Sequence, residues 1–295
     1  IMAAGVEGAG SEDSFGVGIS RPFEEKAAAT IAEDPKLMNF KYFFTRKLTF
    51  MKESHGYALL PGGFGTMDES FELLTLLQTG KTVPAPVVLL DAPGGDYWHS
   101  WYEFVTKQLL TDGLISAEDL TLVKLTDSVD EAVDEMCTFF RNYHSIRFVG
   151  RRLIIRLTHA PTPELIESLN TNFADIVVAG AFEAIDATSS EQNDDDFVHL
   201  HRIAFEFNRR HFARLRQLID ALNLERWARG IARQENNGMW EFFFGEMRRF
   251  PSLISGIIVL ALFESAFVGE IVRAGIQSIP KGQREAARSI GMNRF

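Results

Sequence analysis

The sequence predicts an α/β fold, with a Rossmann-like, mostly parallel sheet flanked by helices. Three observations lead there. Short apolar runs alternate with longer amphipathic segments over residues 15–142, a glycine-rich turn follows one of these runs, and the composition is 46% hydrophobic and 24% charged. Such a composition is typical of a globular protein. Buried strands that alternate with helices are typical of βα units, whose parallel strands are covered on both faces.

The elements follow one another in a regular order. Apolar runs predict strands, and apolar residues at helical spacing predict helices. We expect strands at 15–19, 56–60, 86–90 and 121–125, and helices at 39–53, 67–79, 98–110 and 128–142. Residues 21–37 are polar and predict a surface excursion. Asp68 and Glu69 fall in the first turn of their predicted helix, where the helix dipole favours acidic residues.

The pattern changes after His144, which predicts an α+β extension and then a helical tail. The extension is expected to hold strands at 146–157 and 175–179, a helix at 163–170, an acidic surface linker at 188–196 and a basic helix at 208–222. The sequence thus divides into residues 1–145, 146–223 and 224–295.

Charge and cysteine content exclude several classes of protein. The chain has 295 residues, one cysteine and a net charge of −10. One cysteine excludes a disulfide scaffold and a cysteine-based zinc cluster, and it fits a reducing, cytoplasmic location. The acidic balance argues against nucleic acid as a partner. The tail is basic by comparison, and its uncharged run at 250–263 is short for a membrane span, although it is a candidate for membrane contact.

The most informative segment is 61–69, PGGFGTMDE, between a predicted strand and a predicted helix. Gly62, Gly63 and Gly65 would let backbone N–H groups approach an anion, and the helix N-terminus would add positive partial charge. Thr66 could donate a further hydrogen bond. The segment lacks the lysine of a Walker A motif and the spacing of a dinucleotide-binding fingerprint. The alternative is a tight strand–helix turn that binds nothing.

Three charged residues are expected near this turn. Arg46 and Lys47 lie on the preceding helix, and Glu69 lies on the helix that follows. Ligands of open α/β sheets bind outside the carboxyl ends of the strands, so these groups can converge there. Arg46 is expected to lower the pKa of Glu69 and keep it ionised. The alternative for Arg46 and Glu69 is a structural ion pair.

Two segments together resemble the LOG family, which are phosphoribohydrolases of cytokinin riboside 5′-monophosphates formerly described as lysine-decarboxylase-like. They are FFTRKLTFM at 43–51 and PGGFGTMDESFELLTLLQTGK at 61–81. Residues 86–157, with DYWHSW and YHSIRFVGRRLIIRL, and residues 207–223 resemble the longer bacterial members. The resemblance implies a homodimer that hydrolyses the N-glycosidic bond of an AMP-like nucleoside monophosphate, releasing a free base and ribose 5-phosphate.

The resemblance also implies residue roles. The catalytic pair would be Arg46 and Glu69, the phosphate loop Gly62, Gly63, Gly65 and Thr66, and the pocket wall Met2 and Lys47. Cleavage builds positive charge on the ribose, which a carboxylate such as Glu69 can stabilise. No metal or cofactor is implied. A decarboxylase would need a Schiff-base lysine for pyridoxal phosphate, and no residue singles itself out for that role.

Two departures from the family pattern leave alternatives open. Members carry a first strand, a helix, a second strand and a GGGxG loop ahead of the position that matches Ile1, so we expect the N-terminal strands to be missing. Residues 252–295 resemble the EAA loop of amino-acid ABC transporter permeases, a helix that docks on the ATPase. A non-catalytic nucleotide-binding remnant, or a permease fragment, is therefore the alternative function.

Overall fold

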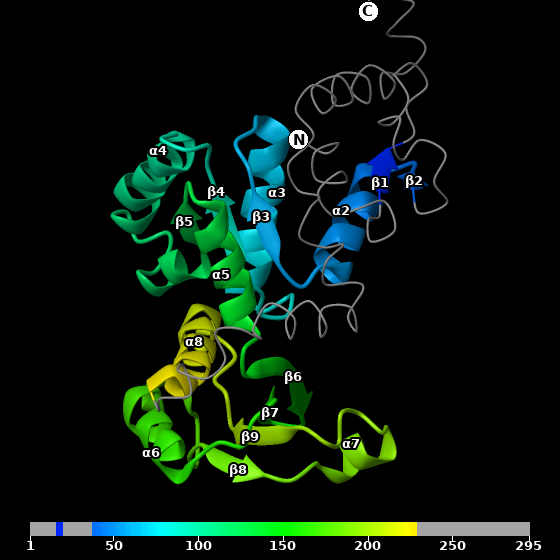
Figure 1. Cartoon of the computed structure of the whole chain (residues 1–295), viewed down its shortest axis with the longest axis vertical. Coiled ribbons are helices and arrows are strands. Elements are labelled where there is room, and N and C mark those ends of the chain that lie inside the picture. Colours follow the sequence, from blue (N-terminus) through cyan, green and yellow to red (C-terminus); the bar gives the residue numbers. More distant parts are fainter. Residues whose placement is uncertain (1–15, 20–36, 229–295) are drawn as a thin grey trace, which may run out of the picture.

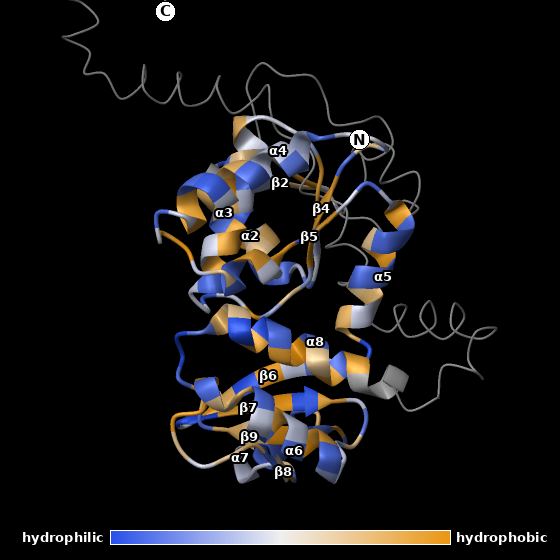
Figure 2. Ribbon diagram, turned by 90° about the vertical axis from the view of Figure 1, so that its left-hand side faces the viewer, coloured by the Kyte–Doolittle hydropathy of each residue, from blue (hydrophilic) through white to orange (hydrophobic). Residues whose placement is uncertain are grey.

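The computed structural model describes residues 16–19 and 37–228 and has the mixed α/β fold that the sequence predicts. Figure 1 shows parallel strands and their helices in one half and an antiparallel sheet in the other. Helix α8 (Phe212–Ala228) lies between the two halves (Figure 2).

The strands of the first half are all parallel. β1 (Gly16–Ile19) pairs with β2 (Leu37–Phe40), and a second sheet has the order β3-β4-β5. These three strands are Tyr57–Leu59, Val87–Leu90 and Lys124–Thr126. The middle strand β4 is the most deeply buried, because its valines and leucines are covered on both faces.

Helices flank these strands as predicted, with shifted boundaries. They are α2 (Phe43–Glu53), α3 (Phe64–Gln78), α4 (Tyr97–Phe104) with a π-helical continuation (Val105–Leu110), a 3-10 helix (Glu118–Leu122) and α5 (Val129–Phe139). The helix expected from residue 39 starts later, because Asn39 and Phe40 pair with β1 as part of β2. Pairing with a neighbouring strand overrides the helical spacing of Phe40. The strand expected at 121–125 likewise begins only at Lys124.

The second half is one antiparallel sheet in the order β6-β7-β9-β8. Its strands are Tyr143–Val149, Arg152–Leu157, His201–Phe205 and Glu183–Ile185 in that order. The single strand predicted at 146–157 is wrong: a hairpin turns at Gly150, whose φ of 59° favours glycine. The strand predicted at 175–179 is also wrong. A 3-10 helix (Ala174–Ile176) follows α6 (Pro163–Asn172), and Val177 makes only one bridge, to Phe207.

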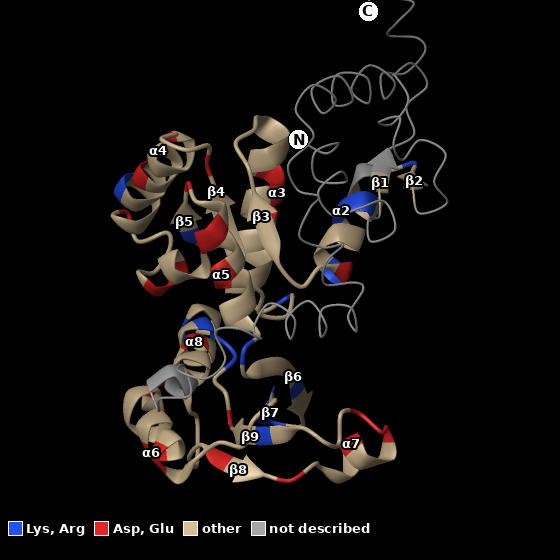
Figure 3. Cartoon of the chain, viewed as in Figure 1, with Lys and Arg blue, Asp and Glu red and all other residues tan. Residues whose placement is uncertain are grey.

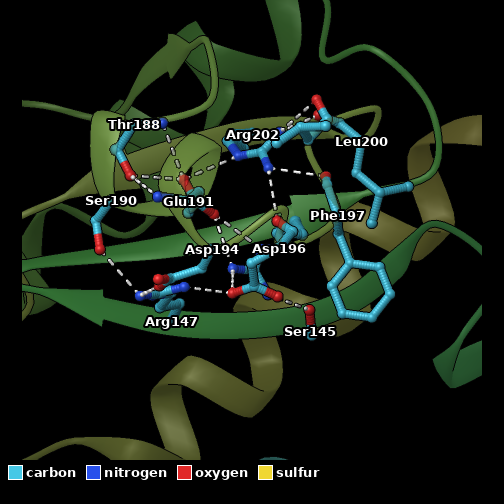
Figure 4. A network of polar contacts seen from close by, with 12 residues as sticks. Ser145, Arg147, Thr188, Ser190, Glu191, Asp194, Asp196, Phe197, Leu200 and Arg202 are labelled. Carbon is cyan, nitrogen blue, oxygen red and sulfur yellow. Dashed lines mark hydrogen bonds and ion pairs between the residues drawn. The ribbon is translucent and has the colours of Figure 1, made fainter.

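The acidic segment 188–196 is mostly exposed, as predicted, but it contains a helix and is a folded part of this half, which corrects its prediction as a linker. Thr188 and Glu191 form a capping box at the start of α7 (Ser189–Asn193). The Glu191 side chain is fully buried. Arg156 Nε donates to one of its oxygens at 2.9 Å, and Arg202 Nε donates to the other at 3.1 Å, as Figure 4 shows for Arg202. Figure 3 shows the basic residues of the sheet beside the acidic α7. Paired charges, which one-dimensional patterns do not show, bury the Glu191 side chain within a segment whose other residues are mostly exposed.

Helix α8 joins the two halves. Its apolar residues, among them Leu215 and Leu218, belong to the core of the antiparallel half, whereas Ala213 belongs to the core of the parallel half. Buried Asn223 accepts hydrogen bonds from the backbone N–H groups of Asn142 and Tyr143 at 2.9 and 3.0 Å. Its amide also donates to the carbonyl of Phe139 at 2.6 Å. One side chain thus satisfies three backbone groups at the end of α5.

Among the described residues, no helix combines the length and hydropathy needed to cross a membrane. The predicted membrane contact of the tail falls on residues outside the described part of the chain.

We expect the substitution Asn223→Ala to lower the free energy of unfolding by about 3–5 kcal/mol, because it leaves buried N–H and carbonyl groups without partners. Urea unfolding followed by circular dichroism measures the change. Asn172→Ala is the matched control, because within the described ranges the exposed side-chain amide of Asn172 bonds only to Ser168 of its own helix. Equal effects of the two substitutions would contradict the role of Asn223 in connecting α8 to the end of α5 through buried hydrogen bonds.

Candidate active site

The glycine turn leads directly from strand β3 into helix α3. Gly63 is the residue before the first helical turn, and its carbonyl accepts the N–H of Met67 at 3.0 Å. The N–H groups of Phe64, Gly65 and Thr66 come before this first donor and have no acceptor inside the helix. Three backbone donors therefore lie at the positive end of α3, the arrangement that binds anions in other proteins.

Helix α3 begins earlier than predicted, and this changes the position of Glu69. The predicted start was Met67, which placed Asp68 and Glu69 in the first turn. The helix starts at Phe64, its first turn holds no acidic residue, and Glu69 lies in the second turn. Thr66 and Glu69 are three residues apart and so lie on one face of the helix.

Thr66 is buried beneath the glycine turn. Its side chain is 2% exposed, and within the described part of the chain its hydroxyl has no hydrogen-bond partner. A Cβ atom on Gly62 would lie 2.1 Å from this hydroxyl oxygen, far inside contact distance. Gly62 is therefore required by the close approach of Thr66.

Arg46 and Glu69 are brought together from separate helices, α2 and α3. Arg46 Nη2 donates to Glu69 Oε1 at 3.2 Å, and the two residues are only 1% and 6% exposed. The second oxygen, Glu69 Oε2, is buried and has no partner among the described residues. The carboxylate is thus held on one side and open to hydrogen bonding on the other.

Burial raises the pKa of Glu69 above its ordinary value, although Lys47 and Arg46 act in the opposite direction. Arg46 does lower the pKa of Glu69, as expected, but burial has the larger effect and the net shift is upward. The loss of water around a buried carboxylate outweighs the attraction of its two neighbouring cations.

Lys47 lies beside the site with its ammonium group directed to other carboxylates. It pairs with Asp68 and, at 2.9 Å, with Glu72, both on α3. Burial lowers the pKa of Lys47, but hydrogen bonds to Asp68 and Glu72 and the nearby charge of Glu69 raise it overall. Lys47 therefore joins α2 to α3 as a charged ammonium.

Most of the residues predicted for the active site lie close together in the structure, and one further residue, Tyr97, joins them. Arg46, Thr66 and Glu69 lie together with the glycine turn, whereas Met2 lies outside the described residues. The addition is Tyr97 of α4, whose hydroxyl donates to the carbonyl of Gly62. The sequence DYWHSW places Tyr97 after strand β4, but no spacing rule indicates which loop its hydroxyl contacts. Among the described residues, no three His, Cys, Asp or Glu side chains cluster as metal ligands would.

A model of a known protein family matches the part of the chain that contains these site residues. Residues 2–136 fit the family model described as "Possible lysine decarboxylase", the family that includes the LOG proteins. The matched residues make up a little under half of the chain. They include Arg46, the glycine turn, Thr66 and Glu69.

Short matches also exist to amino-acid ABC transporter permeases, the class that residues 252–295 are predicted to resemble. The chain is 50% identical over 50 residues to the "Putative amino-acid ABC transporter permease protein YhdX" and 43% identical over 54 residues to the inner membrane permease protein YhdY, both of Escherichia coli K12. It is 49% identical over 43 residues to the glutamate/aspartate import permease protein GltK of Escherichia coli O6:H1.

These matches cover 17%, 18% and 15% of this chain. The chain in turn spans only 13%, 15% and 19% of the length of YhdX, YhdY and GltK.

We expect Gly62→Ala to lower the free energy of unfolding by about 1–3 kcal/mol, since the new methyl group overlaps the buried Thr66 hydroxyl. Thermal unfolding measures the loss. The double substitution Gly62→Ala with Thr66→Ala removes the overlapping oxygen and should recover part of it. A double variant no more stable than Gly62→Ala would show that the Thr66 side chain does not cause the strain.

Proposed function

We propose that the chain is a phosphoribohydrolase of the LOG family that cleaves the N-glycosidic bond of an AMP-like nucleoside 5′-monophosphate. The observation that carries the proposal is the buried Glu69 carboxylate, one oxygen held by Arg46 and the other without a partner among the described residues. A buried carboxylate left half-satisfied is costly for a purely structural ion pair. It is what a site needs if a ligand hydroxyl or a water completes the hydrogen bonding.

The beginning of α3 is suited to hold the 5′-phosphate. The N–H groups of its first turn, which have no acceptor inside the helix, and the buried Thr66 hydroxyl can all donate to phosphate oxygens. Because Thr66 and Glu69 share one face of α3, a phosphate at the helix end places the ribose close to Glu69.

In the proposed reaction, the bond between ribose C1′ and the base nitrogen breaks and its electron pair leaves with the base. Positive charge develops on the ribose, and the Glu69 carboxylate stabilises it. Water then adds to C1′ and loses a proton, which Glu69 can accept, while the base nitrogen gains a proton. Arg46 holds Glu69 in place through Oε1 and leaves Oε2 for the substrate or the water.

The description as a lysine decarboxylase fits the site less well. Pyridoxal phosphate chemistry needs a lysine that can lose its proton and form a Schiff base. Lys47, the lysine of the predicted site, is paired with two carboxylates that raise its pKa and hold it as ammonium. The described site residues therefore do not fit that cofactor. The permease matches cover at most 18% of this chain among the three relatives, so we propose no transport activity.

We expect the chain to release adenine and ribose 5-phosphate from AMP, and Glu69→Gln to reduce kcat by about 100-fold or more, as loss of an acid–base or charge-stabilising group does. Chromatography of the free base measures turnover, and circular dichroism checks that the variant is folded. Glu103→Gln is the control, because Glu103 is exposed and pairs, among the described residues, only with Lys107 in the π-helical continuation of α4.

Two outcomes would count against the proposal. Release of base by Glu69→Gln at the original rate would remove Glu69 from the mechanism. Binding of AMP without turnover by the original chain would favour the alternative of a non-catalytic nucleotide-binding domain.

The raised pKa of Glu69 predicts a specific pH dependence. Because the carboxylate is the active form, kcat/KM should fall as the pH decreases through a value above 4.5, the ordinary value for glutamate. Lys47→Met removes a cation that lowers the pKa of Glu69, so it should move the acid limb to higher pH. Lys52→Met, an exposed lysine on the same helix, should leave the limb in place. An acid limb that is the same for both variants would contradict this assignment.

A further inference from the structure

Tyr97 connects the first residue of α4 to the glycine turn of the proposed site. Its hydroxyl donates a hydrogen bond to the backbone carbonyl of Gly62. The two residues are 35 positions apart: Gly62 lies on the loop that follows β3, and Tyr97 begins the helix that follows the neighbouring strand β4. Neither the catalytic pair nor the proposed phosphate donors include this tyrosine.

The tyrosine is itself held firmly. Its ring packs edge-on against the buried ring of Trp98, with centroids 4.9 Å apart. The backbone N–H of Trp98 donates to Asp91 at 3.2 Å, which fixes the start of α4 to the end of β4. These contacts hold the Tyr97 side chain in place where its hydroxyl meets the glycine turn.

A hydrogen bond to the Gly62 carbonyl determines the orientation of the whole peptide unit between Gly62 and Gly63. In a planar trans peptide the C=O and the N–H point in opposite directions. Two consecutive glycines lack Cβ atoms, so this unit could flip at little steric cost. With the carbonyl bound to Tyr97, the N–H of Gly63 points to the opposite face of the turn. If the unit flipped, a carbonyl oxygen would take that place and repel an anion.

We propose that Tyr97 is a positioning residue that sets the Gly62–Gly63 peptide in the orientation that binds the substrate phosphate. This inference rests on the proposed function, because it assigns the phosphate to the glycine turn. Tyr97 acts through the backbone of Gly62 and does not touch the ribose or the bond that breaks. Its removal should therefore weaken binding of phosphorylated ligands and leave the chemical step nearly unchanged.

The experiment compares Tyr97→Phe with Tyr102→Phe. Tyr102 lies on the same helix and packs against the same apolar core, so its variant controls for loss of a hydroxyl in this region. For Tyr97→Phe we expect KM for AMP to rise about 3- to 10-fold, the effect of one lost hydrogen bond, with kcat within about twofold. Hydrolysis of adenosine, which has no phosphate, should not change.

Calorimetric binding of AMP and of ribose 5-phosphate separates this inference from the proposed function. If the original chain binds AMP without turnover, the proposed function fails, and a 3- to 10-fold weaker binding by Tyr97→Phe alone still supports the positioning role. Equal losses in the Tyr97 and Tyr102 variants, or an equal loss on AMP and adenosine, would overturn it. No binding of either phosphorylated ligand by the original chain would overturn both.

Discussion

The joint burial of Arg46 and Glu69 is the interaction on which the candidate site depends. Each charge would be costly to bury alone, so α2 and α3 must pack at the spacing that lets the two side chains meet. Lys47 adds ion pairs to Asp68 and Glu72 between the same two helices. The glycine turn and the buried Thr66 hydroxyl lie at the start of α3, beside this pair.

A second buried glutamate, Glu191, differs from Glu69 in how completely its carboxylate is hydrogen-bonded. Glu191 is fully buried, yet arginines bind both its oxygens and Thr188 adds two hydrogen bonds. Burial raises the pKa of Glu191, but these hydrogen bonds lower it overall. Glu69 is also buried, but its hydrogen bonding is incomplete and its pKa is raised. A satisfied carboxylate stabilises the fold, whereas an unsatisfied one is available for a ligand.

The parallel half and the core of the site could be predicted from the sequence to a large extent. Short apolar runs gave strands β3 and β4 within a residue or two, because a strand buried on both faces has few other compositions. The glycine turn was recognisable because Gly62, Gly63 and Gly65 stand between a strand and a helix. Predictions failed where pairing between distant residues determines the structure. Strand β2, the hairpin at Gly150 and the buried Glu191 side chain all depend on partners distant in sequence.

The sequence by itself determined the fold class, the family resemblance and which residue types meet near the turn, since local spacing and motif contain that information. Only the tertiary structure decided that Glu69 lies in the second turn of α3, that burial outweighs Arg46 in setting its pKa, and that Tyr97 holds the Gly62 carbonyl. Desolvation and hydrogen bonding between loops depend on three-dimensional neighbours. They are therefore not contained in the periodicity of any one segment.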